Sequence, residues 1–172
     1  MDFRTAIEFQ LRRTHERVHQ CLADLSAEEA RRLPQPRLSP VVWQVGHLAF
    51  YDAKYADGAG VGHAMPAIPP EYGDLFKVGT GGEADYPSVD RVVTVFDGTN
   101  AALEAIARSG ALDTPIEGQM YKDVGGMLMF ACLHRNYHIG KMASLRALLN
   151  KPILFGAPAP AQSADAGRRS RS

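Results

Sequence analysis

Apolar side chains recur every three or four residues in four long segments of this 172-residue chain, and no segment carries a convincing strand pattern. A period close to that of the α-helix places such side chains on one face, which the helix buries against its neighbours. The four segments run from 2 to 25, from 39 to 56, from 88 to 109 and from 123 to 149. The pattern therefore predicts an all-α fold, an antiparallel four-helix bundle.

Residues typical of helix N-termini stand where helices are expected to begin. Ser26 and Glu29 form a capping-box pattern, which predicts a short helical turn after the first long helix. Ser39 followed by Pro40 predicts that Ser39 caps the second long helix and that Pro40 is its first residue. Ser88 is the expected cap of the third long helix.

The length suits one domain, which we expect to span residues 1–155. Residues 156–172 contain no large apolar side chain, and we expect them to form a disordered tail. Between residues 57 and 87 the chain has seven glycines and four prolines and no sustained periodicity. A loop of this length is uncommon inside a domain. Two interpretations stay open: a lid or binding loop, and a mobile surface excursion.

The charge and cysteine content exclude several classes of protein. Nineteen basic and nineteen acidic side chains cancel, so no global field attracts nucleic acid or an anionic membrane. No run approaches the roughly 18 apolar residues of a membrane span, and the N-terminus is too polar for a signal peptide. Two cysteines, Cys21 and Cys132, are too few for a disulfide framework. We expect a cytoplasmic protein with no nucleic-acid or membrane partner.

His134 and His138 are four residues apart in the last predicted helix. On a helical wheel they lie about 40° apart, with Met127, Phe130 and Leu145 within about 40° of His134. Two imidazoles on the apolar face of a bundle helix are costly unless each finds a partner. A divalent metal ion is one partner that both could share, because this spacing lets two imidazoles reach one ion.

His47 is the expected third ligand. It lies in the most apolar of the predicted helices, beside Gly46, which would permit the close approach of another backbone. If the second and fourth long helices are neighbours, His47 meets the pair across the bundle. Three imidazoles suit a divalent zinc, nickel or iron ion and leave one or more coordination positions open.

Other histidines and cysteines fit less well. His15 and His19 are also four apart, but one falls at the border of the apolar stripe and the other toward solvent, so we expect surface residues. His63 lies in the glycine-rich segment and is expected to have no role. Cys21 is expected to be a small core residue, and Cys132 points about 160° away from the His134 face.

An interpretation without metal also stays open. The three histidines could be hydrogen-bonded to polar groups such as Tyr51 and Tyr137. Tyr51 follows His47 by four residues and Lys141 lies close to the His134 face, so each could contact the site or serve packing alone. No catalytic residue is assigned.

Two motifs of this sequence resemble those of the DinB-like superfamily. They are Leu38-Ser-Pro-Val-Val-Trp-Gln-Val-Gly-His47-Leu and, about ninety residues later, His134-x3-His138-x2-Lys-Met-x2-Leu-Arg146 with the stop Asn150-Lys-Pro152. The chain is similar in particular to the N-terminal domain of ergothioneine-type sulfoxide synthases, over roughly residues 2 to 153.

The resemblance implies a four-helix bundle that binds one divalent metal through three histidines, at the positions of His47, His134 and His138. Members of the superfamily include thiol-dependent transferases and isomerases. The sulfoxide synthases carry a second, larger domain without a counterpart in this chain, so we do not expect oxidative C–S bond formation here.

Two hypotheses of function follow. The first is a metal-dependent enzyme, a thiol transferase or a hydrolase, whose three-histidine site activates a small thiol or a water toward a small-molecule substrate. The second is a non-catalytic helical-bundle module that binds a metal or senses a ligand. Both take a small molecule as partner, a low-molecular-weight thiol among the candidates. Bundles of this kind often pair through an exposed helix face, which leaves a homodimer open.

Overall fold

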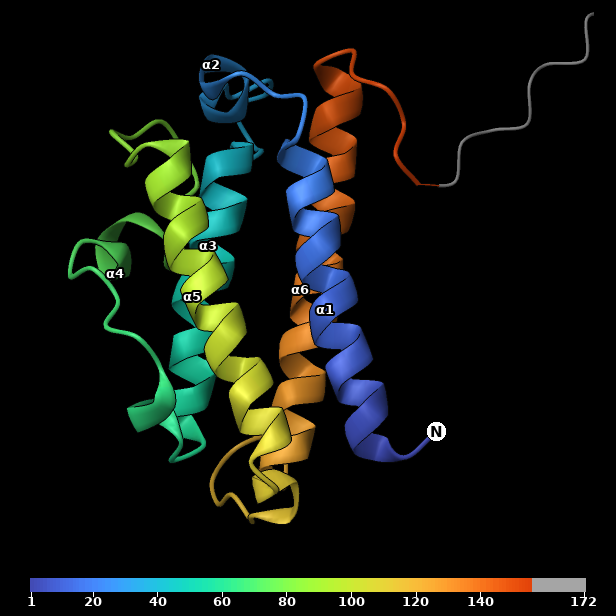
Figure 1. Ribbon diagram of the computed structural model, residues 1–172. Helices are drawn as coiled ribbons and strands as arrows, with labels where there is room; N and C mark the ends of the chain where they lie inside the picture. The colour runs from blue at the N-terminus through green and yellow to red at the C-terminus, as the bar shows by residue number, and fades with distance from the viewer. Residues whose placement is uncertain (156–172) are drawn as a thin grey trace, which may run out of the picture.

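The computed structural model describes residues 1–155, and the tail expected over residues 156–172 lies outside the described residues. Four long helices make up most of the fold (Figure 1): α1 (Phe3–Leu22), α3 (Val41–Gly58), α5 (Val89–Arg108) and α6 (Val124–Leu148). Short helices stand between them: α2 (Ala27–Arg31), α4 (Tyr72–Leu75) and two 3-10 turns, η1 (Gly62–Ala64) and η2 (Ala111–Asp113). Residues 1–155 contain no strand beyond one isolated bridge. The predicted all-α four-helix bundle is confirmed.

The direction of the helices follows from one long connection. Residues 59–88 return along the length of the bundle, so α5 runs in the same direction as α3, while α1 and α6 run the opposite way (Figure 1). Each helix therefore has one antiparallel neighbour, α3 with α6 and α1 with α5, and one parallel neighbour, α3 with α5 and α1 with α6. The expected antiparallel packing thus holds for two of the four neighbouring pairs. A bundle with a long crossover connection is an established variation on the up-and-down order. Five of the six histidines of this chain lie at these two antiparallel seams, and the sixth, His63, lies on η1.

The helix caps agree with the sequence in two of three places. Ser26 and Glu29 form the complete capping box of α2, and the Ser88 hydroxyl accepts a hydrogen bond from the backbone of Arg91. The predicted cap at Ser39 is wrong: α3 begins at Val41, and Pro40 is its N-cap with a ψ of 163° and no side-chain cap. Because Pro40 is still extended, the helix begins one residue later than expected.

A fully buried ion pair fixes α6 against α3. Arg135 Nη2 donates to Asp52 Oδ2 at 2.6 Å, and both side chains have no exposed surface. Arg135 Nη1 also donates to Asn100 Oδ1 of α5 at 2.7 Å. Apolar clusters pack on either side of this network along the bundle. Since Arg135 follows His134 directly, the ion pair also sets the position of the histidine pair along α3.

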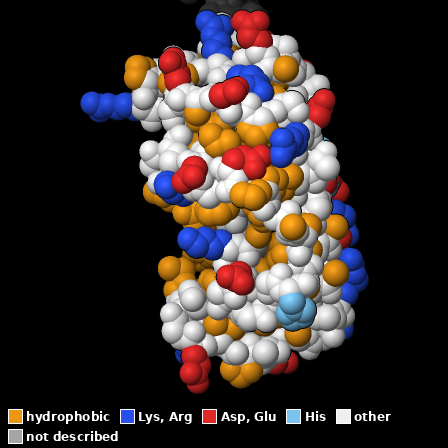
Figure 2. Space-filling model, turned by 90° about the vertical axis from the view of Figure 1, so that its left-hand side faces the viewer, with side chains coloured by type: hydrophobic (Ala, Val, Ile, Leu, Met, Phe, Trp, Pro, Cys, Tyr) orange, Lys and Arg blue, Asp and Glu red, His pale blue; other side chains and the backbone are white. Residues whose placement is uncertain are grey.

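The glycine-rich connection is folded against the bundle. Tyr72 and Phe76 are fully buried there, and Trp43 Nε1 of α3 donates to the carbonyl of Leu75 at 3.0 Å. Figure 2 views the face of the molecule on this side, where Lys, Arg, Asp and Glu side chains are interspersed among apolar atoms. None of the helices in residues 1–155 is both long and apolar enough to cross a membrane.

Candidate metal centre

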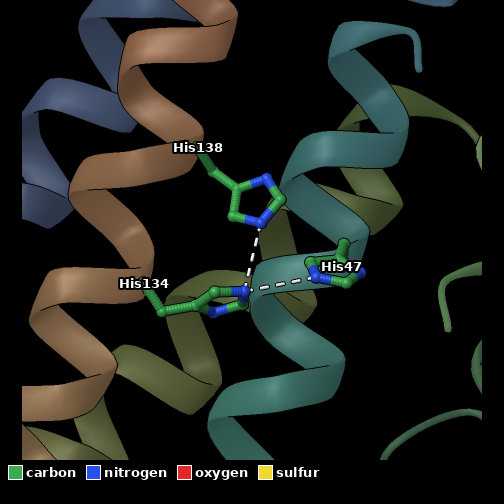
Figure 3. A group of neighbouring side chains, drawn as sticks. All are labelled: His47, His134 and His138. Atoms are coloured by element: carbon green, nitrogen blue, oxygen red, sulfur yellow. Dashed lines mark hydrogen bonds between the residues drawn. The ribbon is translucent and has the colours of Figure 1, made fainter. Parts of the chain in front are cut away.

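The three histidines singled out in the sequence come together between α3 and α6. His134 and His138 project from successive turns of α6, and His47 faces them from α3 (Figure 3). The Nε2 atom of His134 lies 3.3 Å from that of His47 and 3.1 Å from that of His138. His47 and His138 are buried and His134 is partly exposed. The antiparallel seam thus brings residues 87 positions apart into one cluster.

Two of the imidazoles are oriented by hydrogen bonds at their other nitrogen. Nδ1 of His47 lies 2.7 Å from the carbonyl oxygen of Phe76, which can only accept. Nδ1 of His138 lies 2.5 Å from Oε1 of Gln44, whose own Nε2 donates to the Ser39 carbonyl at 3.1 Å. Both Nδ1 atoms therefore carry the proton, and each neutral ring presents an unprotonated Nε2 to the cluster. Orienting a ligand imidazole in this way is typical of metal sites.

The protons of the cluster do not suffice to bond its three Nε2 atoms. Only the Nε2 of His134 is free to carry a hydrogen. That hydrogen can point at the Nε2 of His47 or at the Nε2 of His138, so one of the two short contacts is left without a good hydrogen bond. If the proton lies on Nδ1 instead, that buried atom has no hydrogen-bond partner in the described chain, and three lone pairs face one another. A cation among the three Nε2 atoms would remove this deficit.

The donor set fits a divalent transition metal. Metal–nitrogen bonds of about 2.1 Å place neighbouring ligand atoms of a tetrahedral or octahedral ion about 3.0–3.4 Å apart. The two contacts of 3.3 and 3.1 Å fall in that range, and all three ligand atoms lie within 4.8 Å of one another. His47, His134 and His138 could therefore hold one ion.

Burial keeps the three rings neutral. Desolvation lowers the pKa of His47 and of His134 to about 4 and that of His138 to about 2. Desolvation is the largest cause, and the pKa of His134 and that of His138 also include smaller lowering contributions from the neighbouring imidazoles and from Lys141. Near neutral pH the imidazoles are thus neutral, which is the form that ligates metals.

Gly46 matters because of an aromatic ring. A Cβ at position 46 would lie 2.3 Å from Cε1 of Phe76, whose ring packs against the backbone of α3. The expectation that Gly46 admits another backbone is wrong: the neighbour is the Phe76 side chain. Since the carbonyl of Phe76 binds His47, the missing side chain at position 46 helps to place that hydrogen-bond acceptor. Trp43 stacks on the ring of His47, with ring centroids 4.4 Å apart.

The cluster lines one wall of a cavity of about 570 Å³ that opens to solvent. Residues from α3, α6 and the connections before and after α3 complete the walls: Pro36, Arg37, Ser39, Trp43, Val78, Gly79, Gly81, Gly82, Tyr137 and Lys141. Gly81 approaches Ser39 so closely that a Cβ at position 81 would lie 1.8 Å from the Ser39 hydroxyl oxygen. The glycine-rich connection therefore forms part of the cavity wall, which favours the binding-loop interpretation over a mobile excursion.

The remaining candidates take different places. Tyr51 and Tyr137 contact the histidines through their rings, with centroids 4.5 Å from His47 and 5.1 Å from His138. In the interpretation without metal, these tyrosines were the expected hydrogen-bond partners of the histidines. The structure instead pairs His47 with the Phe76 carbonyl and His138 with Gln44. Lys141 lines the cavity, as its position on the wheel suggests.

The two cysteines and His63 lie outside the cluster. Cys21 and Cys132 are buried free thiols, and burial raises the pKa of each to about 11. His63 is exposed.

Sequence reasoning missed the side chains that support the site. Gln44 precedes His47 by three residues on the same apolar helix, and its polar side chain in that setting was a usable signal. Asp52 is likewise the one acidic side chain well inside that apolar run, and it pairs with Arg135. Phe76 could not be found in this way, because its contribution is a backbone carbonyl.

Comparison with known proteins identifies the family. A family model described as the DinB superfamily matches residues 10–142, a range that includes all three histidines. A comparison with curated proteins gives no match. With most of its described residues covered by that model and a helical bundle as its fold, the chain belongs to the DinB superfamily.

Proposed function

We propose that the protein is a metal-dependent enzyme that uses His47, His134 and His138 to hold a divalent zinc, nickel or iron ion and acts on a small molecule. The observation that carries the proposal is the convergence of three Nε2 atoms, two of them held unprotonated by Phe76 and Gln44. An ion bound by three neutral imidazoles supplies a Lewis acid that lowers the pKa of a thiol or water at an open position. Membership of the DinB superfamily supports this choice of chemistry.

The placement of the cluster favours reaction over a closed structural site. Structural zinc sites are closed by four protein ligands, whereas catalytic sites keep a position open. Here three ligands lie at the wall of a solvent-accessible cavity large enough for a small substrate. Hydrolysis and thiol transfer both fit these features. In thiol transfer to an electrophilic carbon, the S–C bond forms as the bond from that carbon to its leaving group breaks, the leaving group departs with the electron pair, and the thiol proton passes to the leaving group or to solvent.

The residues of the cavity favour an anionic substrate. Lys141 and Arg37 supply positive charge, and no carboxylate stands among the described lining residues. Trp43, which stacks on His47, and the 78–82 segment provide the apolar and backbone surface beside the cluster. A small thiol that carries a carboxylate suits these walls, because its carboxylate would pair with the cations while its sulfur faces the histidines.

A screen of thiol-transfer and hydrolysis reactions tests the proposal. Protein purified without chelator is assayed with added zinc, nickel or iron(II), and again after chelation. We expect one reaction that is lost on chelation, regained on adding metal and absent in His138→Ala, while His63→Ala at an exposed histidine keeps it. Lys141→Met should raise KM for an anionic substrate with a smaller effect on kcat. A metal-loaded protein without activity across these classes would contradict the enzyme proposal.

One observation favours the second hypothesis, a non-catalytic module that binds a metal or senses a ligand. Among the described residues that line the cavity, none is an acidic side chain that could act as a general base. A sensor would bind its ligand at the metal and change shape or partner without turnover. A ligand that perturbs the spectrum of the cobalt-substituted protein but is recovered unchanged would support this hypothesis over the enzyme.

A further inference from the structure

A second cluster of metal-ligating side chains lies on the other antiparallel seam of the bundle. His15 and His19 project from successive turns of α1, and Asp97 meets them from α5. None of the three contributes to the three-histidine cluster between α3 and α6. The side chains of His15 and His19 are 26 % and 40 % exposed, which agrees with their predicted positions at the border of the apolar stripe of α1 and toward solvent. Their shared partner, Asp97, was not predicted from the sequence.

The three side chains converge on one point. Nε2 of His15 and Nε2 of His19 each lie 2.7 Å from the same oxygen, Oδ1 of Asp97, and 3.2 Å from each other. Ligand atoms around an octahedral ion with bonds of about 2.1 Å lie about 3.0 Å apart. The triangle of donor atoms therefore has nearly the dimensions of one face of a coordination polyhedron.

Hydrogen bonding alone explains this triangle less well. It would need both rings to carry hydrogen on Nε2 and to direct both hydrogens at one carboxylate oxygen, with the two donors only 3.2 Å apart. The other oxygen of Asp97 accepts no hydrogen bond from the side chains in residues 1–155. A cation bound by two unprotonated Nε2 atoms and one carboxylate oxygen removes the conflict between the donors.

The surroundings hold the cluster in place and leave it accessible. The His15 ring stacks on Phe96, with centroids 5.5 Å apart, and packs edge-on against His19 at 4.6 Å. Phe96 is fully buried and precedes Asp97 in α5, so one anchored turn supports both sides of the cluster. The side chain of Asp97 is 43 % exposed, which leaves room for water on the outer side of an ion.

We infer that His15, His19 and Asp97 form a second binding site for a divalent transition metal, independent of the three-histidine centre. Two imidazoles and one carboxylate suit zinc, nickel, copper or iron(II), with the remaining positions taken by water. The bound ion would link α1 to α5. Because it binds the folded chain, it would also raise stability with increasing metal concentration.

Zinc titration of the full chain against a chromophoric competitor, after removal of bound metal, tests the inference. We expect two ions per wild-type chain, and one in each of Asp97→Asn and His19→Gln. The matched controls, Asp90→Asn at an exposed carboxylate of the same helix and His63→Gln, should each keep two. His138→Ala should lose the other ion and keep the one bound by Asp97. Far-UV circular dichroism confirms that each variant is folded.

Each other outcome decides a separate point. Two ions retained in both Asp97→Asn and His19→Gln would overturn the second site. One ion in the wild type, lost in His138→Ala but kept in Asp97→Asn, would overturn it while leaving the three-histidine centre standing. One ion that survives His138→Ala and is lost in Asp97→Asn would support the second site and contradict the first. A wild-type chain that binds no zinc would overturn both.

Discussion

At the scale of single residues, the chemistry of the candidate centre depends on which nitrogen of each imidazole carries hydrogen. The Phe76 carbonyl and Gln44 Oε1 accept only, so they fix the proton of His47 and of His138 on Nδ1. This leaves the buried cluster short of protons and rich in lone pairs, an arrangement that a cation completes. The supporting acceptors are thus as much part of the site as the ligands.

Replacing Gln44 by Met tests this dependence. The substitution keeps the volume but leaves the Nδ1–H of His138 without an acceptor in a buried position. We expect a loss of about 1–3 kcal/mol in the free energy of unfolding of the metal-free protein. Metal affinity should fall about 10–100-fold. Urea unfolding and competition titration measure the two effects, and Gln20→Met at an exposed glutamine of α1 should change neither. An unchanged metal affinity in Gln44→Met would contradict the orienting role.

Gly46 and Gly140 form a matched pair of helical glycines. Alanine at position 46 would push its Cβ into the Phe76 ring, whereas nothing lies within 4 Å of a Cβ at position 140. We expect Gly46→Ala to destabilise by about 1–3 kcal/mol through overpacking and to weaken metal binding. Gly140→Ala should stabilise by up to about 1 kcal/mol through helix propensity. Thermal unfolding and metal titration compare them. Equal effects of the two substitutions would show that the position of the Phe76 ring does not depend on the missing side chain at Gly46.

At the scale of the helices, the antiparallel pairing of α3 with α6 decides which histidines meet. The sequence places His134 and His138 on one face and His47 on an apolar helix, so the ligand set follows once these helices are neighbours. The wheel could not show that α1 meets α5 with Asp97 beside His15, because periodicity identifies a buried face without saying which helix covers it. For the same reason the pattern could not predict the crossover connection, because a bundle with a crossover and an up-and-down bundle bury the same helix faces.

Breaking the Asp52–Arg135 ion pair between α3 and α6 should cause a large loss of stability. Asp52→Ala leaves the buried guanidinium of Arg135 hydrogen-bonded to Asn100 and stacked over the Phe96 ring, without a counter-ion among its partners in the described residues. We expect a loss of about 3–5 kcal/mol in the free energy of unfolding, because an uncompensated charge stays buried. Asp74→Ala, which removes an exposed pair with Lys77, should change it by less than about 1 kcal/mol. Urea unfolding provides the comparison. A loss as small in Asp52→Ala as in Asp74→Ala would mean that the pair does not hold α6 in place.

At the scale of the whole molecule, the three buried histidines make stability depend on pH. In the unfolded chain their pKa is near 6.5, whereas in the folded chain burial lowers it to about 4 for His47 and His134 and to about 2 for His138. Between these values the unfolded state binds more protons, so the free energy of unfolding falls as the pH falls. The stabilisation is complete above about pH 6.5.

The metal-free protein should therefore lose stability steadily as the pH is lowered from about 6.5 to 4.5, within the window between the unfolded and folded pKa values. The lowered pKa of Asp24, which is bonded to Arg146, affects stability only at lower pH, below the ordinary pKa of a carboxyl group. Thermal unfolding in the presence of chelator measures the effect. His138→Gln should show a shallower dependence, since one of the titrating groups is gone. A flat profile in the wild type would contradict the buried, neutral state of the cluster.

The proposed chemistry depends on one ion held by three imidazoles between α3 and α6. An anomalous difference map, recorded at the absorption edge of the metal found in crystals of untagged protein, tests this most directly. We expect a peak at bonding distance from the Nε2 atoms of His47, His134 and His138, with an open side toward the cavity. A map of metal-supplemented crystals without a peak at these three atoms would contradict the metal centre, and a fourth protein ligand would contradict the open position that the proposed reaction needs.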